Sequence, residues 1–573
     1  MNIKRAIEDL IKSTLRDLGV NEEVSFNIEH PEDHTNGDYS SNVAMVFAKS
    51  LQKNPKDFAL SIVEVLKEKI KENEHTQKIF LDVKTAGAGF INFYLSPDFF
   101  HKSIQDILEE KDFGKNDLFA GKKVMIEYTQ PNPFKPFHVG HLMSNTIGES
   151  LSRVIEYSGA NMIRANYQGD VGLHVAKAIY GIFDKGEPDK SLPVSSQAQH
   201  IGECYSYASN LYDTDENIKK EIDVINKKVY ERSDEKINNI YDWGREVTLE
   251  AFEEIYKKLG TKFDYYFFES EMAPKGEKIV RENIGKVFEE SEGAIVFKAE
   301  KYDSKLHTRV FITKALLPTY ETKEIALTTT KFEKENPDLS IVITAIEQAD
   351  YMKVVEKAIE QMYPDWASRM KHVTHGMMRL ASGKMSSRKG NVITGESLMQ
   401  DSFSAIMDIL KDKEMSQEEK DKIASVVSVS ALKYSVLKQS LNGDIIFDFD
   451  KSISFDGDSG PYLQYSFARA SSLLRKVNGE LIQGNLSNEI STLERILYRF
   501  GEVVERSAEE LAPNHIASYL IEVARAFNVY YSENKIIDTE EGTSEYRVNL
   551  VKAFTLVMQK GLYLLGVEAP EKM

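Results

Sequence analysis

A short apolar strand, followed by a proline-rich loop and a helix that begins with two histidines, constrains the fold of this chain more than any other feature. The run KVMIEY at 123–128 favours a strand, the loop TQPNPFKPF follows it, and apolar residues recur with helical period from Val139. Further strand-like runs, IRANYQGD, AIVFKA, RVFIT and LSIVITA, are separated by helical patterns. This alternation predicts an α/β fold built on a parallel sheet.

Four regions are expected along the 573 residues, because this length suggests about three or four domains. Charged, helix-favouring sequence at about 176–275 interrupts the strand rhythm, and we interpret it as an insertion between two halves of the sheet. Nearly all of the sequence after 396 has helical period, which predicts a C-terminal helical bundle. The expected regions are an N-terminal α+β module at 1–112, the sheet-bearing region at 113–395, a connecting helical region at 396–455 and the bundle at 456–573.

Composition excludes several classes of protein. With 42% hydrophobic and 28% charged residues the chain is neither disordered nor collagen-like, and no run approaches the roughly 18 apolar residues of a membrane helix. The first residues, MNIKRAIEDL, lack the apolar core of a signal peptide and carry Glu8 and Asp9, so we expect a cytoplasmic protein without a membrane partner. The single cysteine, Cys204, excludes an intrachain disulfide and a cysteine-rich zinc site.

The net charge of −18 gives no support for a nucleic-acid partner, because phosphate binding favours Lys and Arg. A large enzyme needs only a local basic track for RNA, however, and the charge of the whole chain averages such a track away. Charge alone therefore counts mildly against RNA binding without excluding it.

The segment KPFHVGHL at 135–142 carries the most informative chemistry. His138 and His141 lie three residues apart and therefore on one face of the predicted helix, at an N-terminus whose unpaired N–H groups attract phosphate. Both imidazoles are placed to donate hydrogen bonds to a triphosphate, and Gly140 would let a flat adenine ring approach the backbone. An isolated HxGH is also typical of surface or core histidines. Zinc binding is a third interpretation, although no cysteine or further histidine cluster nearby completes a site.

The segment SGKMSSRKGN at 382–391 combines glycines, hydroxyls and three cations. Cations at this spacing are suited to clamp the β and γ phosphates of a nucleotide, and the serines add neutral donors. Alone, the segment is equally typical of a solvated basic turn; its pairing with the histidine segment upstream favours a nucleotide site. The loop residues expected to bind the nucleotide are Lys384, Met385, Ser386, Ser387, Arg388 and Lys389, with the cations and the serines on its phosphates.

The motifs HVGH and KMSSR resemble the two signatures of class I aminoacyl-tRNA synthetases. EYTQPNPFKPFHVGHL is similar to the pattern of the arginyl-tRNA synthetase family, in which a Glu, a Pro-Asn pair and a Lys-Pro pair precede the signature. NYQGDVGLH, YETKEIA, EQADYM, FDFD through GPYLQY, and the terminal GVEAPEKM are similar to further blocks of that family. The resemblance spans the chain in order, including an N-terminal module with GDYSSNVAMVFAK and GFINF.

The resemblance implies a Rossmann-like catalytic core and an arginine–tRNA ligase. Such an enzyme activates L-arginine with ATP as arginyl-adenylate and transfers it to the 3′-terminal adenosine of tRNA(Arg), with Mg²⁺ arriving on the ATP and with tRNA bound before activation. We expect a monomer. The implied catalytic residues are Lys135, His138, His141 and Lys384, and Gly140 joins the histidines and the basic loop in binding ATP.

A guanidinium needs planar acceptors, which carboxylates supply best. By motif position, the implied arginine-binding residues are Glu127, Asn132, Glu292, Tyr320, Glu324 and Gln348. Three positions depart from the family pattern. Glu324 stands where Asp is usual, Gln130 where Ser is common and Ser387 where a second Lys is usual. Because the Glu324 side chain is one methylene longer than Asp, its carboxylate would extend to a different depth in the pocket.

RNA contacts are also implied by motif position. Unpaired bases are read by stacking on aromatic rings and by edge hydrogen bonds. Tyrosines at helical spacing in a bundle are more often core residues, and that interpretation stays open. The implied residues are Tyr462, Tyr465, Tyr531 and Met573 around the anticodon, and Phe90 and Asn92 at the tRNA elbow.

Two other functions remain possible at this stage. A class I nucleotidyltransferase that makes an activated nucleotide without tRNA shares the HxGH motif, but such enzymes are typically shorter and lack a helical C-terminal third. A synthetase-like RNA-binding protein without activity is the second alternative, and the intact HVGH and KMSSR motifs speak against it.

Overall fold

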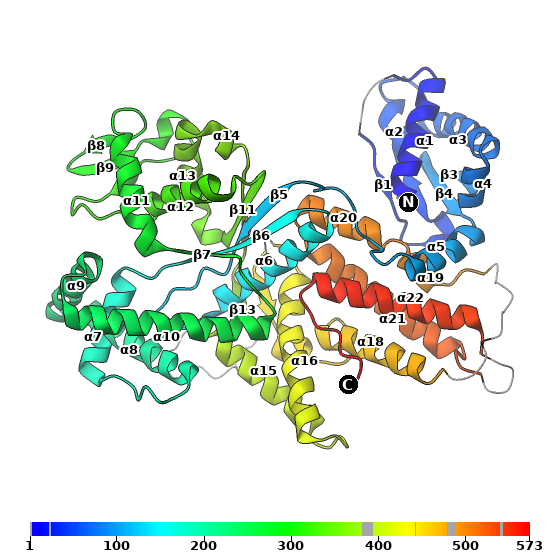
Figure 1. Cartoon of the computed structure of the whole chain (residues 1–573). Coiled ribbons are helices and arrows are strands. Elements are labelled where there is room, and N and C mark those ends of the chain that lie inside the picture. The colour runs from blue at the N-terminus through cyan, green and yellow to red at the C-terminus, as the bar shows by residue number, and fades with distance from the viewer. Residues whose placement is uncertain are drawn as a thin grey trace.

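The computed structural model describes residues 3–21, 25–380, 394–441, 443–477, 481, 489–538 and 543–573. Figure 1 shows the N-terminal module at one end of the molecule, the helical bundle beneath it, and the sheet with its flanking helices in the middle and at the other end. The predicted α/β multidomain architecture is therefore confirmed. The four region boundaries drawn from the sequence stay predictions.

The N-terminal module packs helices against a small antiparallel sheet. Alternating apolar residues of the strands and one stripe of each helix bury a separate core, which includes Ile7, Phe58, Ile62 and Phe93. The sheet has the order β1-β2-β4-β3. Its strands are β1 (Ile28–Glu29), β2 (Tyr39–Ser41), β3 (Phe80–Ala86) and β4 (Phe90–Leu95), and its helices are α1 (Ile3–Asp17), α2 (Val43–Ala48), α3 (Pro55–Glu72), α4 (Glu74–Ile79) and α5 (Pro97–Glu109).

The central sheet is five-stranded, with the order β12-β11-β5-β6-β7 and parallel pairing throughout. Four of the five β5 residues are buried, as expected for a strand covered on both faces. The chain runs from β5 outward to β7 and then returns to the other side of β5, so the strand order reverses there. In open parallel sheets, ligands bind at such a reversal, beyond the carboxyl ends of the strands. The strands are β5 (Lys123–Glu127), β6 (Asn161–Gln168), β7 (Tyr265–Phe268), β11 (Leu339–Ala345) and β12 (Met370–His375).

Two strand predictions were wrong. AIVFKA and RVFIT were expected in the parallel sheet, but they form an antiparallel sheet of order β10-β9-β8, from β8 (Glu289–Ser291), β9 (Ala294–Phe297) and β10 (Arg309–Ile312). Glu292 and Gly293 both have positive φ, 49° and 85°, and such a two-residue turn folds β8 and β9 into a hairpin. The fifth strand of the parallel sheet is instead β7, which lies inside the range 176–275 expected to be an insertion.

Helices surround the central sheet, and four of them form the helical insertion between β6 and β7. Asp234 caps α10 by accepting from the amides of Lys236 and Ile237, and Gly260 ends it in the left-handed conformation. The insertion helices are α7 (Leu173–Lys185), α8 (Val194–Thr214), α9 (Glu216–Glu231) and α10 (Glu235–Leu259), and the others are α6 (Val139–Tyr157), α11 (Glu269–Glu282), α12 (Tyr320–Glu335), α13 (Ala349–Met362) and α14 (Pro364–Ala367).

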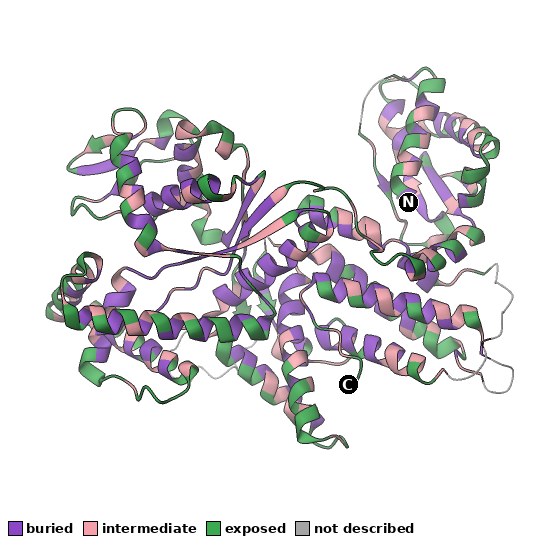
Figure 2. Cartoon of the chain, in the orientation of Figure 1, coloured by how far each residue is buried: buried purple, intermediate pink, exposed green. Residues whose placement is uncertain are grey.

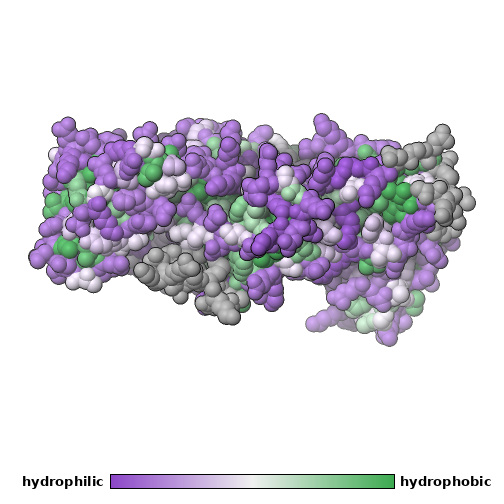
Figure 3. All heavy atoms as spheres, turned by 90° about the horizontal axis from the view of Figure 1, so that it is seen from below, coloured by the Kyte–Doolittle hydropathy of each residue, from purple (hydrophilic) through white to green (hydrophobic). Residues whose placement is uncertain are grey.

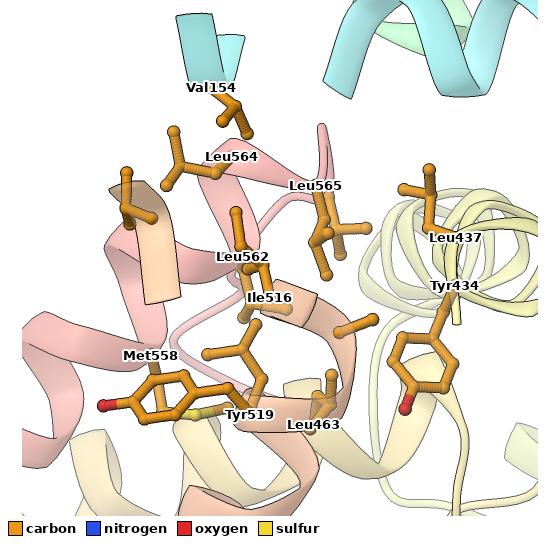
Figure 4. Close-up of a cluster of buried hydrophobic side chains, with 14 of the residues drawn as sticks. Val154, Tyr434, Leu437, Leu463, Ile516, Tyr519, Met558, Leu562, Leu564 and Leu565 are labelled. Atoms are coloured by element: carbon orange, nitrogen blue, oxygen red, sulfur yellow. The ribbon is translucent and has the colours of Figure 1, made fainter. Parts of the chain in front are cut away.

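The C-terminal bundle shares one hydrophobic core with the sheet region. Figure 4 shows Val154 of α6 close to Leu564 of the last helix, and Figure 2 shows mostly buried residues in the middle of the molecule, where the sheet and these helices meet. β13 (Met378–Leu380) and β14 (Ile445–Phe447) pair in parallel beside the bundle. The helices before the bundle are α15 (Gly395–Leu410), α16 (Gln417–Leu437) and α17 (Phe449–Ser452). The bundle helices are α18 (Gly460–Arg475), α19 (Thr492–Leu497), α20 (Phe500–Glu510), α21 (Asn514–Glu533) and α22 (Glu545–Leu564).

Cations bind the carboxyl ends of two helices where the bundle meets the sheet region. The buried Nζ of Lys433 donates to the carbonyls of Leu259 at 2.5 Å and Gly566 at 2.6 Å. Arg153 of α6 donates to the carbonyls of Gly260 and Tyr563, both at 2.9 Å. Carbonyls at the ends of α10 and α22 are thus satisfied by the amino group of Lys433 and the guanidinium of Arg153, and the charge of Arg153 also complements the helix dipoles.

The molecular surface is mostly hydrophilic on the face shown in Figure 3, with apolar side chains in small groups. Within the described part of the chain, no helix combines the length and the apolar character that a membrane crossing requires.

Candidate functional site

A cleft of about 400 Å³ opens at the carboxyl ends of the five parallel strands. Residues at or just beyond the carboxyl ends of β5, β6, β7, β11 and β12 all contribute to it, as expected where the strand order reverses. The lining residues are Thr129, Gln130, Asn132, Lys135, His138, Gly140, His141, Ser144, Tyr167, Gly169, Glu269, Tyr320, Glu324, Val342, Thr344, Ala345, Gln348, Tyr351, Met352 and His375.

The two histidines of HVGH form the start of α6. His138 is the N-cap, and its Nδ1 accepts the amide of His141 at 3.4 Å, while Nδ1 of His141 accepts the amide of His138 at 3.3 Å. The rings stack with centroids 3.5 Å apart. Because each Nδ1 accepts a hydrogen bond, the proton of each neutral ring lies on Nε2.

Both imidazoles are uncharged at neutral pH. Burial and the nearby Lys135 lower the pKa of His138 to about 4. Burial also lowers the pKa of His141 well below its ordinary value, and the neighbouring His138 and Lys135 add to the effect. The Nε2–H groups are therefore permanent neutral donors beside the cleft, which suits them to bind phosphate oxygens without an internal charge clash.

Gly140 and Lys135 complete this part of the cleft. A Cβ at Gly140 would stand 3.0 Å from Cε1 and Nδ1 of His138, so the glycine permits the ring packing of the histidines. Lys135 lines the cleft, and burial lowers its pKa, with Lys177 adding repulsion. Its ammonium lies 5.4 Å from the ring centre of Tyr205 on α8.

Two carboxylates line the cleft, Glu269 buried and Glu324 half-buried. Glu324 on α12 was expected from the sequence; burial raises its pKa to about 8, and the charge of Glu127 adds to the rise. Glu269, the first residue of α11, was not expected. It pairs with the buried Lys323 at 2.6 Å, and burial raises its pKa although that ammonium opposes the shift. Two carboxylates in one partly apolar cleft favour a cationic ligand.

Asn132, Tyr320 and Gln348 also line the cleft, as the sequence predicted. Tyr320 begins α12 and is 64% exposed, so it lies at the mouth of the cleft. Gln348 accepts a hydrogen bond from Tyr351 at 3.3 Å.

Two of the expected arginine-binding residues lie elsewhere. Glu127 ends β5, is 1% exposed and lies behind the cleft wall, where it pairs with Lys331 and accepts from Gln130 at 2.7 Å. Glu292 does not join the cleft residues. It lies in the hairpin turn between β8 and β9, its side chain is 85% exposed, and it pairs with Lys314 at 3.4 Å.

The basic segment lies outside the described residues, and with it the expected ligands Lys384, Met385, Ser386, Ser387, Arg388 and Lys389. The chain is described again from Thr394, which forms an isolated β-bridge with His138. The amide of Gly395 donates to the carbonyl of Phe137 at 2.7 Å. Thr394 and Gly395, the first described residues after the basic segment, therefore lie directly beside the histidine pair.

The expected RNA-binding residues divide into exposed and buried ones. Tyr465 and Tyr531 are each 38% exposed, and the guanidinium of Arg469 lies 4.8 Å and 5.7 Å from their ring centres. Tyr462 is half-buried and its hydroxyl accepts from Asn528 at 2.9 Å. Met573 packs against a small core that includes Ile406.

In the N-terminal module, Phe90 is 41% exposed at the start of β4. Asn92 is 3% exposed, and its Oδ1 accepts from the hydroxyl of Ser40 at 2.7 Å. Phe90 is available to a partner on the surface, whereas Asn92 holds two strands together.

The sequence reasoning missed several cleft residues besides Glu269, chiefly Tyr167, Tyr351 and His375. Tyr167 and His375 lie at the carboxyl ends of β6 and β12, and this position was the available signal. Among the described residues, no group of three or more His, Cys, Asp or Glu side chains is placed to hold a metal ion.

Three family models match the chain in order. Residues 5–95 match the arginyl tRNA synthetase N terminal domain, residues 103–449 the catalytic domain of the class I tRNA synthetases (R), and residues 463–573 the DALR anticodon binding domain. The class I catalytic domain is one that uses ATP.

Curated relatives and solved structures cover the same length. The arginine–tRNA ligase of Clostridium perfringens is 30% identical, with 100% of each chain covered, and that of Fusobacterium nucleatum is 32% identical, with 99% of each covered. The arginyl-tRNA synthetase of Thermus thermophilus has a similar fold, with a TM-score of 0.81, 23% identity and 100% of each chain covered. The arginyl-tRNA synthetase of Plasmodium falciparum also has a similar fold, with a TM-score of 0.79, 21% identity, and 100% of this chain and 99% of the other covered. On its motifs, its cleft and these full-length relatives, this chain belongs to the arginyl-tRNA synthetase family of class I aminoacyl-tRNA synthetases.

Proposed function

We propose that this protein ligates L-arginine to tRNA(Arg) at the expense of ATP. The observation that carries the proposal is that one cleft contains both acidic groups and hydrogen-bond donors. The acidic groups are the carboxylates of Glu269 and Glu324, and the donors are the Nε2–H groups of His138 and His141 and the ammonium of Lys135. The carboxylates suit the two cationic groups of arginine, the guanidinium and the α-ammonium. The imidazoles and the ammonium suit a triphosphate.

In the first step, a carboxylate oxygen of arginine attacks the α-phosphorus of ATP. The bond from that phosphorus to the bridging oxygen of the β-phosphate breaks, and pyrophosphate leaves. His138, His141 and Lys135 stabilise the charge that develops on the leaving group, together with Lys384 of the basic segment. In the second step, a hydroxyl of the terminal tRNA adenosine attacks the arginyl carbonyl and releases AMP. Positioning and charge stabilisation accelerate both steps, so no side-chain nucleophile is needed.

The arginine subsite contains Glu324, Glu269, Tyr320, Gln348 and Asn132. Glu127 contributes indirectly, because its charge acts on Glu324 from behind the cleft wall. Glu292 is left out of the subsite, because it lies in an exposed hairpin turn.

Mg²⁺ reaches the site as the complex with ATP, whose phosphates it would neutralise. The carboxylates among the described cleft residues are assigned to arginine and the histidine Nε2 atoms carry protons, so the described side chains do not form a dedicated metal cage.

The bundle at 456–573 would bind the anticodon through exposed rings such as Tyr465 and Tyr531, and the module at 1–112 would contact the tRNA elbow near Phe90. We further propose that the protein works in the cytoplasm and as a monomer. One chain contains both the carboxylates and the histidines of the cleft, which supports the monomer. Light scattering of the purified protein tests its oligomeric state.

Arginine-dependent exchange of labelled pyrophosphate into ATP, with tRNA(Arg) present, tests the function. Citrulline in place of arginine is the matched control, because it has nearly the shape of arginine but no charge on its side chain. We expect exchange with arginine and none with citrulline or lysine. Exchange that needs neither arginine nor RNA would favour the nucleotidyltransferase alternative.

A further inference from the structure

Glu269 owes its place in the cleft to the junction between β7 and α11. It is the first residue of α11, directly after the last residue of β7. Its carboxylate forms an ion pair with Lys323. A carboxylate at such a junction moves whenever the first turn of the helix moves. The groups that fix this turn therefore control how Glu269 meets a ligand.

Asp170 fixes the first turn of α11. This carboxylate is fully buried in the loop after β6, accepts the amide of Ser270 at 2.8 Å and accepts the Ser270 hydroxyl at 2.7 Å. It thus satisfies one of the unpaired amides at the helix N-terminus and holds the residue next to Glu269.

The insertion holds Asp170 in turn. Nε of Arg245 on α10 donates to Asp170 at 2.8 Å, and the same guanidinium lies 4.1 Å from the ring centre of Phe268, the last residue of β7. The insertion also reaches the partner of Glu269, because Tyr230 of α9 accepts from Lys323 at 3.4 Å. Neither Arg245 nor Asp170 lines the cleft.

We propose that the helical insertion sets the enzyme's affinity for arginine through Arg245 and Asp170, positioning residues that hold Glu269 without touching the substrate. The proposal deepens the function proposed above and rests on Glu269 contacting a cationic group of arginine. Loss of a hydrogen bond to a buried charged group typically changes an equilibrium tenfold or more. The effect should appear in arginine recognition and leave ATP recognition alone, because the ATP part of the cleft is built on α6.

The test compares Michaelis constants in steady-state aminoacylation. Asp170→Asn keeps the shape of the side chain but removes an acceptor, and Ser270→Ala removes one donor while leaving the helix amide in place. We expect KM for arginine to rise about tenfold or more in Asp170→Asn and severalfold in Ser270→Ala. KM for ATP should stay within about twofold and kcat at saturating arginine within about threefold. Arg245→Lys should restore most of the affinity that Arg245→Gln loses.

The matched control is Asp242→Asn on the same helix. It removes the ion pair of Asp242 with Arg232, whose Nη2–Oδ2 distance is 2.6 Å, at an exposed position of α10. A purely structural role for Asp170 would lower the melting temperature and the active fraction, and hence kcat, without separating the two KM values. That result, or an Asp170→Asn enzyme that matches Asp242→Asn, would overturn the inference.

Glu269→Gln separates this inference from the proposed function. If the enzyme charges arginine but Glu269→Gln leaves KM for arginine unchanged, both the assignment of Glu269 and the inference fail, while the proposed ligase activity survives. If Glu269→Gln raises KM and Asp170→Asn does not, only the inference fails.

Discussion

His138 and His141 cap each other: the Nδ1 of each ring accepts the backbone amide of the other residue, at 3.4 Å and 3.3 Å. This pair of hydrogen bonds has two effects. It satisfies N–H groups at the start of α6 and it fixes the tautomer that places both protons on Nε2.

The first prediction separates these two effects. In His138→Asn the side-chain oxygen still caps the helix, but the Nε2 donor is gone. We expect arginine activation to slow about a hundredfold, equivalent to about 3 kcal/mol, with the melting temperature nearly unchanged. His138→Ala should show the same rate loss and also destabilise the protein by about 1 kcal/mol. Pyrophosphate exchange and thermal unfolding measure the two effects, and an unimpaired Asn variant would refute the donor role.

His141→Ala should cut adenylate formation just as severely while leaving the affinity for tRNA nearly intact, because the residues proposed to contact the anticodon and the elbow lie in the bundle and the N-terminal module. Filter binding of tRNA(Arg) and pyrophosphate exchange test this together. An equal loss of both would mean that the histidine is structural.

The second prediction concerns pH. With a pKa of about 8, Glu324 holds a proton in the free protein at neutral pH, whereas a guanidinium ligand favours the carboxylate. Arginine binding should therefore release a proton, and affinity should rise about tenfold per pH unit up to pH 8 and then level off. Calorimetry in buffers of different ionisation enthalpy measures the release. Glu324→Gln is the control and should lose this pH dependence; a wild-type affinity that is constant from pH 6 to 8 would rule the mechanism out.

The third prediction concerns the contact between the bundle and the sheet region. Burial lowers the pKa of Lys433 to about 7, against 10.5 for an exposed lysine, so the unfolded chain binds more protons between these values. The contribution of this group to stability therefore rises with pH from about 7 to 10. The stability advantage of wild type over Lys433→Met should grow over that range in urea unfolding. Lys422→Met, an exposed position on the same helix, should show no such trend.

The fourth prediction addresses RNA. Tyr465 and Tyr531 present partly exposed rings close to the guanidinium of Arg469, an arrangement that suits stacking of unpaired bases. Alanine at either position should weaken tRNA(Arg) binding by about 1–3 kcal/mol without changing the melting temperature. Tyr462→Phe, which removes only a hydroxyl bonded to Asn528, is the control and should bind tRNA normally. Full affinity in both alanine variants would place the anticodon elsewhere.

The sequence predicted the parts of the cleft that lie within continuous motifs. HVGH stands out by its residue types at a strand-to-helix junction, whereas Asn132, Tyr320 and Glu324 were assigned by their resemblance to family motifs, and the structure brings these residues to one cleft. The alternation of strands and helices predicted a parallel sheet, but the reversal of strand order at β5 is known only from the strand pairing.

Glu269 and Glu292 show what local pattern could not supply. Glu269 reaches the cleft because β7 pairs with β6, a long-range contact, and because the insertion brings Arg245 to Asp170. Glu292 stands before a strand-like run, but Glu-Gly at 292–293 is a two-residue hairpin turn, and this turn chemistry was the overlooked signal. Strand pairing, and not the local sequence around either residue, therefore decides that Glu269 lines the cleft and Glu292 does not.

The central claim is that the cleft at the end of β5 selects arginine for attachment to tRNA. The most direct test is to incubate the pure protein with total tRNA, ATP and each of the labelled amino acids in turn. The account predicts acid-precipitable label with arginine alone, and much slower labelling by the Glu324→Gln and His141→Ala variants. Charging with lysine or any other amino acid, or no charging at all by a folded protein, would contradict it.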